Sequence, residues 1–127
     1  MTATPEPAST HPTTAPDPAV PDLAGEARDI AEVPAAEVSA AAAVHLMSAA
    51  AVKCGLAEEG PELRDLDEAR KLITALTGLV TAARPDLGIH AAPLRDGLQA
   101  LQRAFREAST EPDARGEGPG EKLTGPV

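Results

Sequence analysis

A run of fifteen residues without a charged side chain, from Val38 to Val52, sets the strongest constraint on how this chain can fold. The run consists mostly of Ala and Ser. We expect it to lie in a helix that opens at Pro34, where a missing N–H costs nothing, and that ends near Cys54 before the stop signal Gly55. A helix that is small or apolar on every side is either buried all round or shared between chains. Two neighbouring helices therefore cannot easily bury all of the apolar surface of this helix.

A second helix has the clearest pattern in the sequence. Asp65 can cap its start, and Glu68 three residues later completes a capping-box-like pair. Its apolar residues recur at the spacing of one helical face, and they are Ala69, Leu72, Ile73, Leu76, Leu79, Val80 and Ala83. Gly78 interrupts this pattern, which predicts that a neighbouring backbone passes close to it. Pro85 marks the end, because it disfavours helical geometry in the preceding residue.

A third helix is predicted to begin at Pro93. Its apolar stripe consists of Leu94, Leu98, Leu101, Phe105 and Ala108. Together the three helices predict an all-α fold, a small three-helix bundle formed by residues 34–109.

Two tails are predicted on either side of this bundle. Residues 1–22 contain six Pro and six Ser or Thr but no Leu, Ile or Phe, so they cannot bury enough apolar surface to become ordered. Residues 23–33 are either a linker or a short amphipathic helix. Residues 110–127 are rich in Gly and Pro, and we expect them to be a disordered tail or a short recognition peptide.

The composition excludes several classes of protein. A single Cys allows neither an internal disulfide nor a multi-cysteine metal site, which fits a reducing cytoplasm. The 20 acidic and 11 basic residues give a net charge of −9, and only one residue is aromatic, so nucleic-acid binding is not expected. The chain begins without a signal peptide's basic and apolar segments. Its longest apolar run falls short of the roughly 20 residues that span a bilayer. We therefore expect a cytoplasmic protein without membrane or nucleic-acid partners.

Two residues of the first helix, His45 and Cys54, are candidates for a regulatory role. Nine residues apart on one helix, they lie on opposite faces and cannot form a nucleophilic dyad. Nothing in the sequence brings His90 to Cys54. His45 is either a packed or interfacial side chain or a pH-sensitive contact. Cys54 is either a small buried side chain or a redox-responsive thiol.

The charged clusters do not indicate an enzyme. The acidic residues between Glu58 and Glu68 lack the alternation of a calcium loop, and helix capping accounts for several of them. Arg95, Arg103 and Arg106 form a modest basic face, which is either a solvated surface or a docking surface for an acidic partner, including the chain's own N-terminal segment. We find no paired base and nucleophile, metal cage or cofactor loop, so we expect no catalysis, no cofactor and no metal.

Self-association is the favoured function. A bundle of this size has few large apolar side chains, so a lone monomer would be marginally stable. A homo-oligomer, most simply a two-fold dimer, would cover the apolar surface of the first helix that the other two leave open. That surface is predicted to consist of Val44, Met47 and Ala51. The chain would then be a non-catalytic interaction module with an unknown protein partner. The alternative is a small regulatory protein that responds to redox or a ligand through Cys54 or His45.

Two separated motifs give the chain a family resemblance. The run Val44-His45-Leu46-Met47-Ser48-Ala49-Ala50 resembles the Leu-Met-Ser helix of the bacterial domain-of-unknown-function family numbered 1844. The run Leu66-Asp67-Glu68-Ala69-Arg70-Lys71-Leu72-Ile73 resembles that family's second signature, and Leu94 to Arg106 resembles its last helix. The resemblance covers about Ile30 to Glu107. It implies a small cytoplasmic helical protein without an assigned activity or catalytic residues. The flanking residues and the excess of Arg over Lys resemble actinobacterial members.

Overall fold

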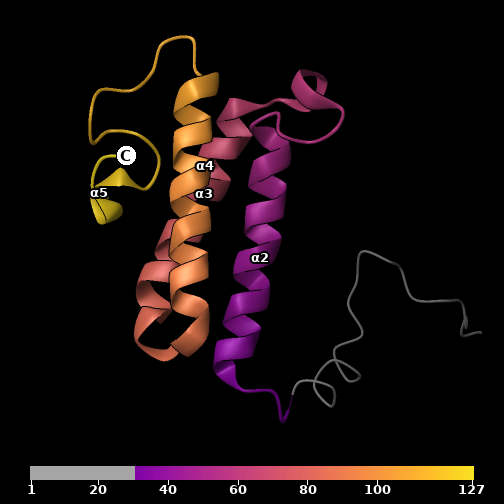
Figure 1. The fold of residues 1–127 in the computed structure, drawn as a ribbon, viewed down its shortest axis with the longest axis vertical. Coiled ribbons are helices and arrows are strands. Elements are labelled where there is room, and N and C mark those ends of the chain that lie inside the picture. Colours follow the sequence, from indigo (N-terminus) through magenta and orange to yellow (C-terminus); the bar gives the residue numbers. More distant parts are fainter. Residues whose placement is uncertain (1–30) are drawn as a thin grey trace, which may run out of the picture. The chain divides into compact units, whose positions relative to one another are not determined.

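Three long helices make up most of residues 31–127, the part of the chain that the computed structural model describes (Figure 1). They are α2 (Ala35–Lys53), α3 (Leu66–Ala83) and α4 (Ala91–Ala108). Short 3-10 helices connect them at η1 (Gly60–Leu63), η2 (Arg84–Asp86) and η3 (Gly88–His90), and a last short helix is α5 (Glu121–Thr124). These described residues contain no strand. The predicted all-α three-helix bundle is confirmed.

The predictions for the N-terminal part of the chain lie mostly outside the described residues. The segment predicted to be disordered, residues 1–22, is not described, and neither is most of the predicted linker or short helix at 23–33. Residues 31–33 form a turn and a bend. The compact unit described below begins at Pro34.

The ends of α2 and α4 fall close to their predicted positions. Pro34 precedes α2 as its N-cap, whereas we expected it to be the first helical residue. Gly55 follows α2 with a φ of 87°, a left-handed conformation that glycine adopts without strain, and it ends the helix as predicted. Helix α4 begins at Ala91, two residues before Pro93. Pro93 still lies in the first turn, where its missing N–H breaks no helical hydrogen bond.

Asp65 caps α3 as predicted, but the capping box is only half formed. The Glu68 backbone N–H donates to Asp65 Oδ1 at 3.2 Å. The reciprocal bond is absent because the Asp65 N–H donates instead to the Lys53 carbonyl oxygen at 2.8 Å. The Glu68 carboxylate pairs with Lys71 one turn along α3. The Asp65 N–H thereby joins the start of α3 directly to the end of α2.

The core lies between the apolar stripes of the three helices. From α3 and α4 it takes the predicted residues Ala69, Ile73, Leu76, Val80, Leu94, Leu98, Leu101 and Phe105. Leu87, between η2 and η3, is also buried. Helix α2 contributes Ala40, Ala43 and Ala50, and Cys54 continues its stripe. Small side chains on α2 allow its backbone to approach α3 and α4 closely, while the bulk of the core comes from those two helices.

The close approach that we predicted at Gly78 occurs at Gly97 instead. A Cβ at Gly78 would have no neighbouring atom within 4 Å, so the prediction for this residue is wrong. A Cβ at Gly97 of α4 would collide with the Met47 methyl carbon (Cε) of α2. The Met47 thioether therefore packs over Gly97, which leaves room for the longest apolar side chain of α2.

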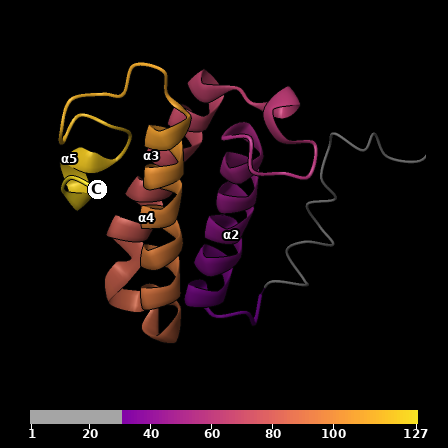
Figure 2. The ribbon, with the colours of Figure 1, turned by 45° about the horizontal axis from the view of Figure 1, so that its top comes forward.

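Residues 110–127 pack against the bundle, which corrects the prediction of a disordered C-terminal tail. Figures 1 and 2 show the chain folding back after α4 so that α5 lies beside the bundle. Gln102 of α4, 1% exposed, donates from Nε2 to the Pro119 carbonyl oxygen and to Thr124 Oγ1, each at 3.0 Å. These bonds satisfy the buried amide nitrogen of Gln102 and hold α5 against the bundle, while the buried Gln102 Oε1 has no hydrogen-bond partner among the described residues.

A second set of contacts holds the start of this C-terminal segment. Arg70 of α3 pairs with Asp113 at 3.0 Å, and its guanidinium carbon lies 4.9 Å from the centre of the Phe105 ring. Arg106 donates to the Asp113 carbonyl oxygen at 3.0 Å. Further along, the buried Glu121 carboxylate accepts the Gly116 backbone N–H. A segment poor in apolar residues is thus ordered by polar contacts with distant parts of the chain.

Candidate functional site

The side of α2 that points away from the core has no charged residue between Val38 and Val52. We call it the outer face of α2, and it consists of Val38, Ala41, Ala42, His45, Ser48, Ala49 and Val52. Five of these seven side chains are exposed, and the remaining two, Ala49 and Val52, are half-buried. Within α2, only Ala40, Ala43 and Ala50 are buried. The other helices therefore cover one stripe of α2 and leave its outer face open.

Two large exposed apolar side chains lie on or beside this face, Val38 within it and Val44 at its border. Of the seven in the described residues, four lie on α2 or in the segment just after it, and they are Val38, Val44, Leu56 and Leu63. Single exposed apolar residues are normal on a protein surface, but exposed valines on a helix face without a charged residue make that face a candidate interaction surface. The outer face of α2 and its surroundings are thus the strongest candidate for an interface in the described part of the chain.

The structure separates the three predicted interface residues. Val44 is 53% exposed and borders the outer face of α2, as a partner contact requires. Met47 and Ala51 are half-buried and pack against the core, so the prediction that the bundle leaves them uncovered is wrong. Met47 belongs to the buried stripe of α2 because it lies four residues after Ala43 and three before Ala50. The sequence shows no preferred side of this helix, since small apolar residues surround it.

His45 and Cys54 lie on opposite faces, as predicted, with His45 exposed and Cys54 2% exposed. Burial raises the pKa of the Cys54 thiol, and the positive charge of Arg64 lowers it by a smaller amount. A buried thiol with a raised pKa is protonated at neutral pH and reacts slowly, which disfavours a redox-responsive role.

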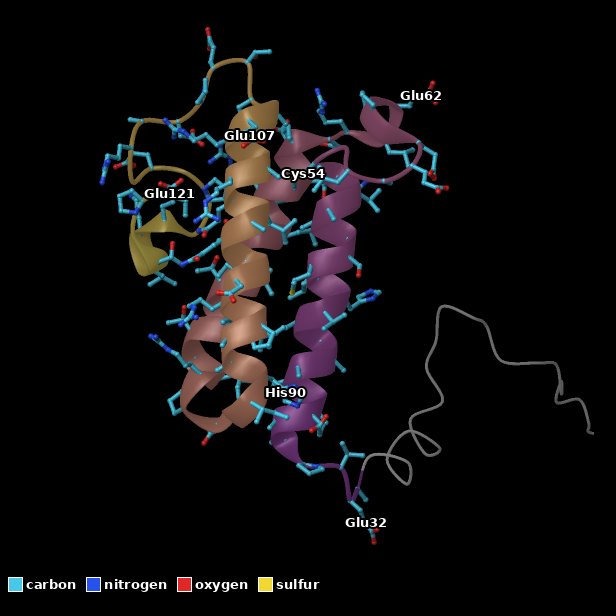
Figure 3. The ribbon with its side chains drawn as sticks, viewed as in Figure 1. Glu32, Cys54, Glu62, His90, Glu107 and Glu121 are labelled. Carbon is cyan, nitrogen blue, oxygen red and sulfur yellow. The ribbon has the colours of Figure 1, made fainter. Side chains whose placement is uncertain are left out.

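His90 lies far from Cys54. Its Nε2 pairs with Glu37 Oε1 at 3.0 Å near the start of α2, whereas Cys54 follows the end of that helix (Figure 3). The structure therefore brings no histidine to the single thiol from among the residues it describes.

The described residues bear on two further possibilities, a metal site and a membrane-spanning helix. No group of three or more His, Cys, Asp or Glu side chains is placed to hold a metal ion. Helix α2 is long and apolar enough to cross a membrane by length and composition alone. One such helix near the N-terminus carries little weight, because core helices of soluble proteins and signal sequences meet the same criterion.

A hollow lies on another part of the bundle, between the end of α3, the start of α4 and α5. Its volume is about 270 Å³. Its apolar lining includes Val80, Leu98 and Leu123, and its polar lining includes Arg84, Arg95 and Thr124. The sequence placed Arg95 on a basic face, but it could not show this hollow, because Leu123 and Thr124 reach it only when the C-terminal segment packs against the bundle.

The family model described as "Domain of unknown function (DUF1844)" matches residues 35–107, more than half of the chain. The chain belongs to the DUF1844 family. This confirms the family that the sequence motifs resemble. No curated protein and no solved structure matches the chain.

The DUF1844 match covers the bundle and stops before the C-terminal segment. Residues 35–107 contain α2, α3 and all but the last residue of α4. The outer face of α2 lies wholly within the matched region. The α5 wall of the hollow, with Leu123 and Thr124, lies outside it.

Proposed function

We propose that this DUF1844 chain is a non-catalytic interaction module that self-associates as a two-fold dimer through the outer face of α2. The observation that carries the proposal is the exposure of this face, which has no charged side chain over four turns of helix. Exposed apolar surface is costly in water, and a second chain that covers it stabilises the folded state.

The sequence of the outer face supports a second copy of this chain as the occupant. Counting from His45, a Val lies seven residues away in both directions and an Ala lies four residues away in both directions. The residues three away, Ala42 and Ser48, are both small. Two antiparallel helices centred on His45 would set Val38 of one copy level with Val52 of the other. A two-fold interface must be complementary to itself, and this pattern meets that requirement.

The remaining parts of the proposal follow from composition. The net charge of −9 and the single aromatic residue support a protein partner rather than nucleic acid. The lone, buried Cys54 supports a cytoplasmic location, where thiols stay reduced. The excess of Arg over Lys supports an actinobacterial-type member of the family.

The test compares two Ala→Glu substitutions at exposed helical positions by light scattering coupled to size exclusion. Ala42→Glu puts a carboxylate into the outer face of α2, and Ala100→Glu puts one on the exposed side of α4. Burying an unpaired charge costs several kcal/mol, so Ala42→Glu is expected to raise the dimer dissociation constant by about 100-fold or more. The wild type and Ala100→Glu should show twice the chain mass of 12.9 kDa at micromolar concentration. Ala42→Glu should show the single mass with unchanged helicity by circular dichroism.

Two results would contradict the proposal. A wild-type chain that stays monomeric at micromolar concentration has no dimer to explain, and its binding to lipid vesicles would identify a membrane as the occupant instead. A dimer that Ala42→Glu leaves intact places the interface on another surface.

A further inference from the structure

The hollow between α3, α4 and α5 has a positively charged lining, although the chain as a whole is acidic. The chain carries 20 acidic and 11 basic residues, yet the hollow is lined by two arginines and no acidic residue. Among the described residues, no acidic side chain pairs with Arg84. Arg95 reaches only its neighbour Asp96, at 3.4 Å, and both side chains are more than half exposed. Such an exposed pair contributes little, so both guanidinium groups are available to an anion.

The rest of the hollow is apolar. Val80 and Leu98 are 6% and 2% exposed and form a fixed part of the lining. Leu123 of α5 is 62% exposed, which leaves much of a leucine side chain open to contact. A guanidinium group binds a carboxylate through two parallel N–H···O bonds. An alkyl chain attached to that carboxylate would replace water against Leu123, with the buried Leu98 behind it.

From this combination we infer that the hollow binds a medium-chain alkyl carboxylate, with its head group between Arg84 and Arg95 and its chain against Leu98 and Leu123. The volume of about 270 Å³ lies just below the range of pockets for drug-sized ligands, so the ligand is small. This binding site is independent of the proposed dimer, because no residue of the outer face of α2 lines it.

The α5 wall of the site is held in place before any ligand binds. Gln102 donates from Nε2 to the Pro119 carbonyl oxygen and to Thr124 Oγ1, which fixes Thr124 and sets Leu123 beside the hollow. The Glu121 carboxylate of α5 also accepts the Gly116 N–H, at 3.1 Å. A wall that is ordered in the free protein adds no ordering cost to binding.

The experiment titrates octanoate into the full chain and follows methyl resonances by NMR. Octanoate has about ten non-hydrogen atoms, which corresponds to a dissociation constant on the order of 0.1–1 mM. We expect saturable binding of one octanoate per chain, with the largest shifts at Val80, Leu98 and Leu123. Acetate keeps the charge without the chain, and octanol keeps the chain without the charge, so neither should saturate over the same range.

Two variants separate the site from the general charge of the surface. Arg84→Gln combined with Arg95→Gln should weaken octanoate binding at least about tenfold, because both cations are lost. Arg103→Gln, an exposed arginine of α4 outside the hollow, should leave binding unchanged. Thermal unfolding checks that each variant is folded. Octanoate that fails to saturate up to about 10 mM, that binds the double variant equally well, or that shifts methyl groups elsewhere overturns the inference.

Discussion

Replacing Gly120 with Ala tests whether the C-terminal segment is fixed against the bundle. Gly120 precedes α5 in a left-handed conformation, with φ 77° and ψ −9°. A Cβ there would collide with Thr77 Oγ1 and lie 3.1 Å from Gln102 Nε2. Both neighbours are buried, and Thr77 Oγ1 also donates to the Ile73 carbonyl oxygen at 2.7 Å. The added methyl group therefore meets side chains that cannot withdraw.

The structure sets the size of the expected effect. The left-handed conformation costs an alanine about 1 kcal/mol, and forcing a methyl group into a packed region costs about 1–3 kcal/mol more. The sum of about 2–4 kcal/mol would raise the population of chains with an undocked segment by roughly 30- to 700-fold. Gly116→Ala is the matched control, because Gly116 has a φ of 82° but its Cβ would meet only Pro126 Cγ at 3.9 Å. It should raise that population only about fivefold.

Amide hydrogen exchange measures this population directly. The Gly125 N–H donates to the Glu121 carbonyl oxygen at 2.8 Å at the C-terminal end of α5, and its exchange rate reports how often the segment opens. We expect faster exchange at Gly125 in Gly120→Ala than in Gly116→Ala, with core amides of α3 protected in both variants. Equal exchange in the two variants, or a wild-type Gly125 that exchanges as fast as a free peptide, would refute the docking of this segment.

Four further predictions concern the bundle, and urea unfolding measures the first three. Gly78→Ala should raise the free energy of unfolding by about 0.5–1 kcal/mol, because the residue lies in mid-helix and its Cβ would meet nothing within 4 Å. Ile73→Ala should lower it by about 2–5 kcal/mol, because Ile73 is fully buried. Burial raises the pKa of the Cys54 thiol in the folded chain, so the unfolded chain loses its proton first as the pH rises. The free energy of unfolding should therefore fall above about pH 8.5, an effect that Cys54→Ala removes. At neutral pH, Cys54 should react with alkylating reagents only after unfolding.

The sequence alone determined the helices and much of their packing. Helix α3 could be predicted because a helix repeats every 3.6 residues, so apolar side chains at that spacing identify the buried face before any partner is known. The stripe of α4 from Leu94 to Phe105 followed from the same rule, and it is buried. Asp65 and Gly55 act over a few residues, which is why a cap and a stop could be found locally.

The tertiary structure decided which side of α2 is buried and whether the C-terminal segment is ordered. Helix α2 has small apolar residues on all sides, so its periodicity does not distinguish Met47, which packs over Gly97, from Ala42, which is exposed. Residues 110–127 have the composition of a disordered tail. Their order depends on Arg70 and Gln102, which are distant in sequence and meet the segment only after the three helices have packed together. Local sequence patterns predict neither the buried side of α2 nor the order of residues 110–127, because both depend on contacts between distant parts of the chain.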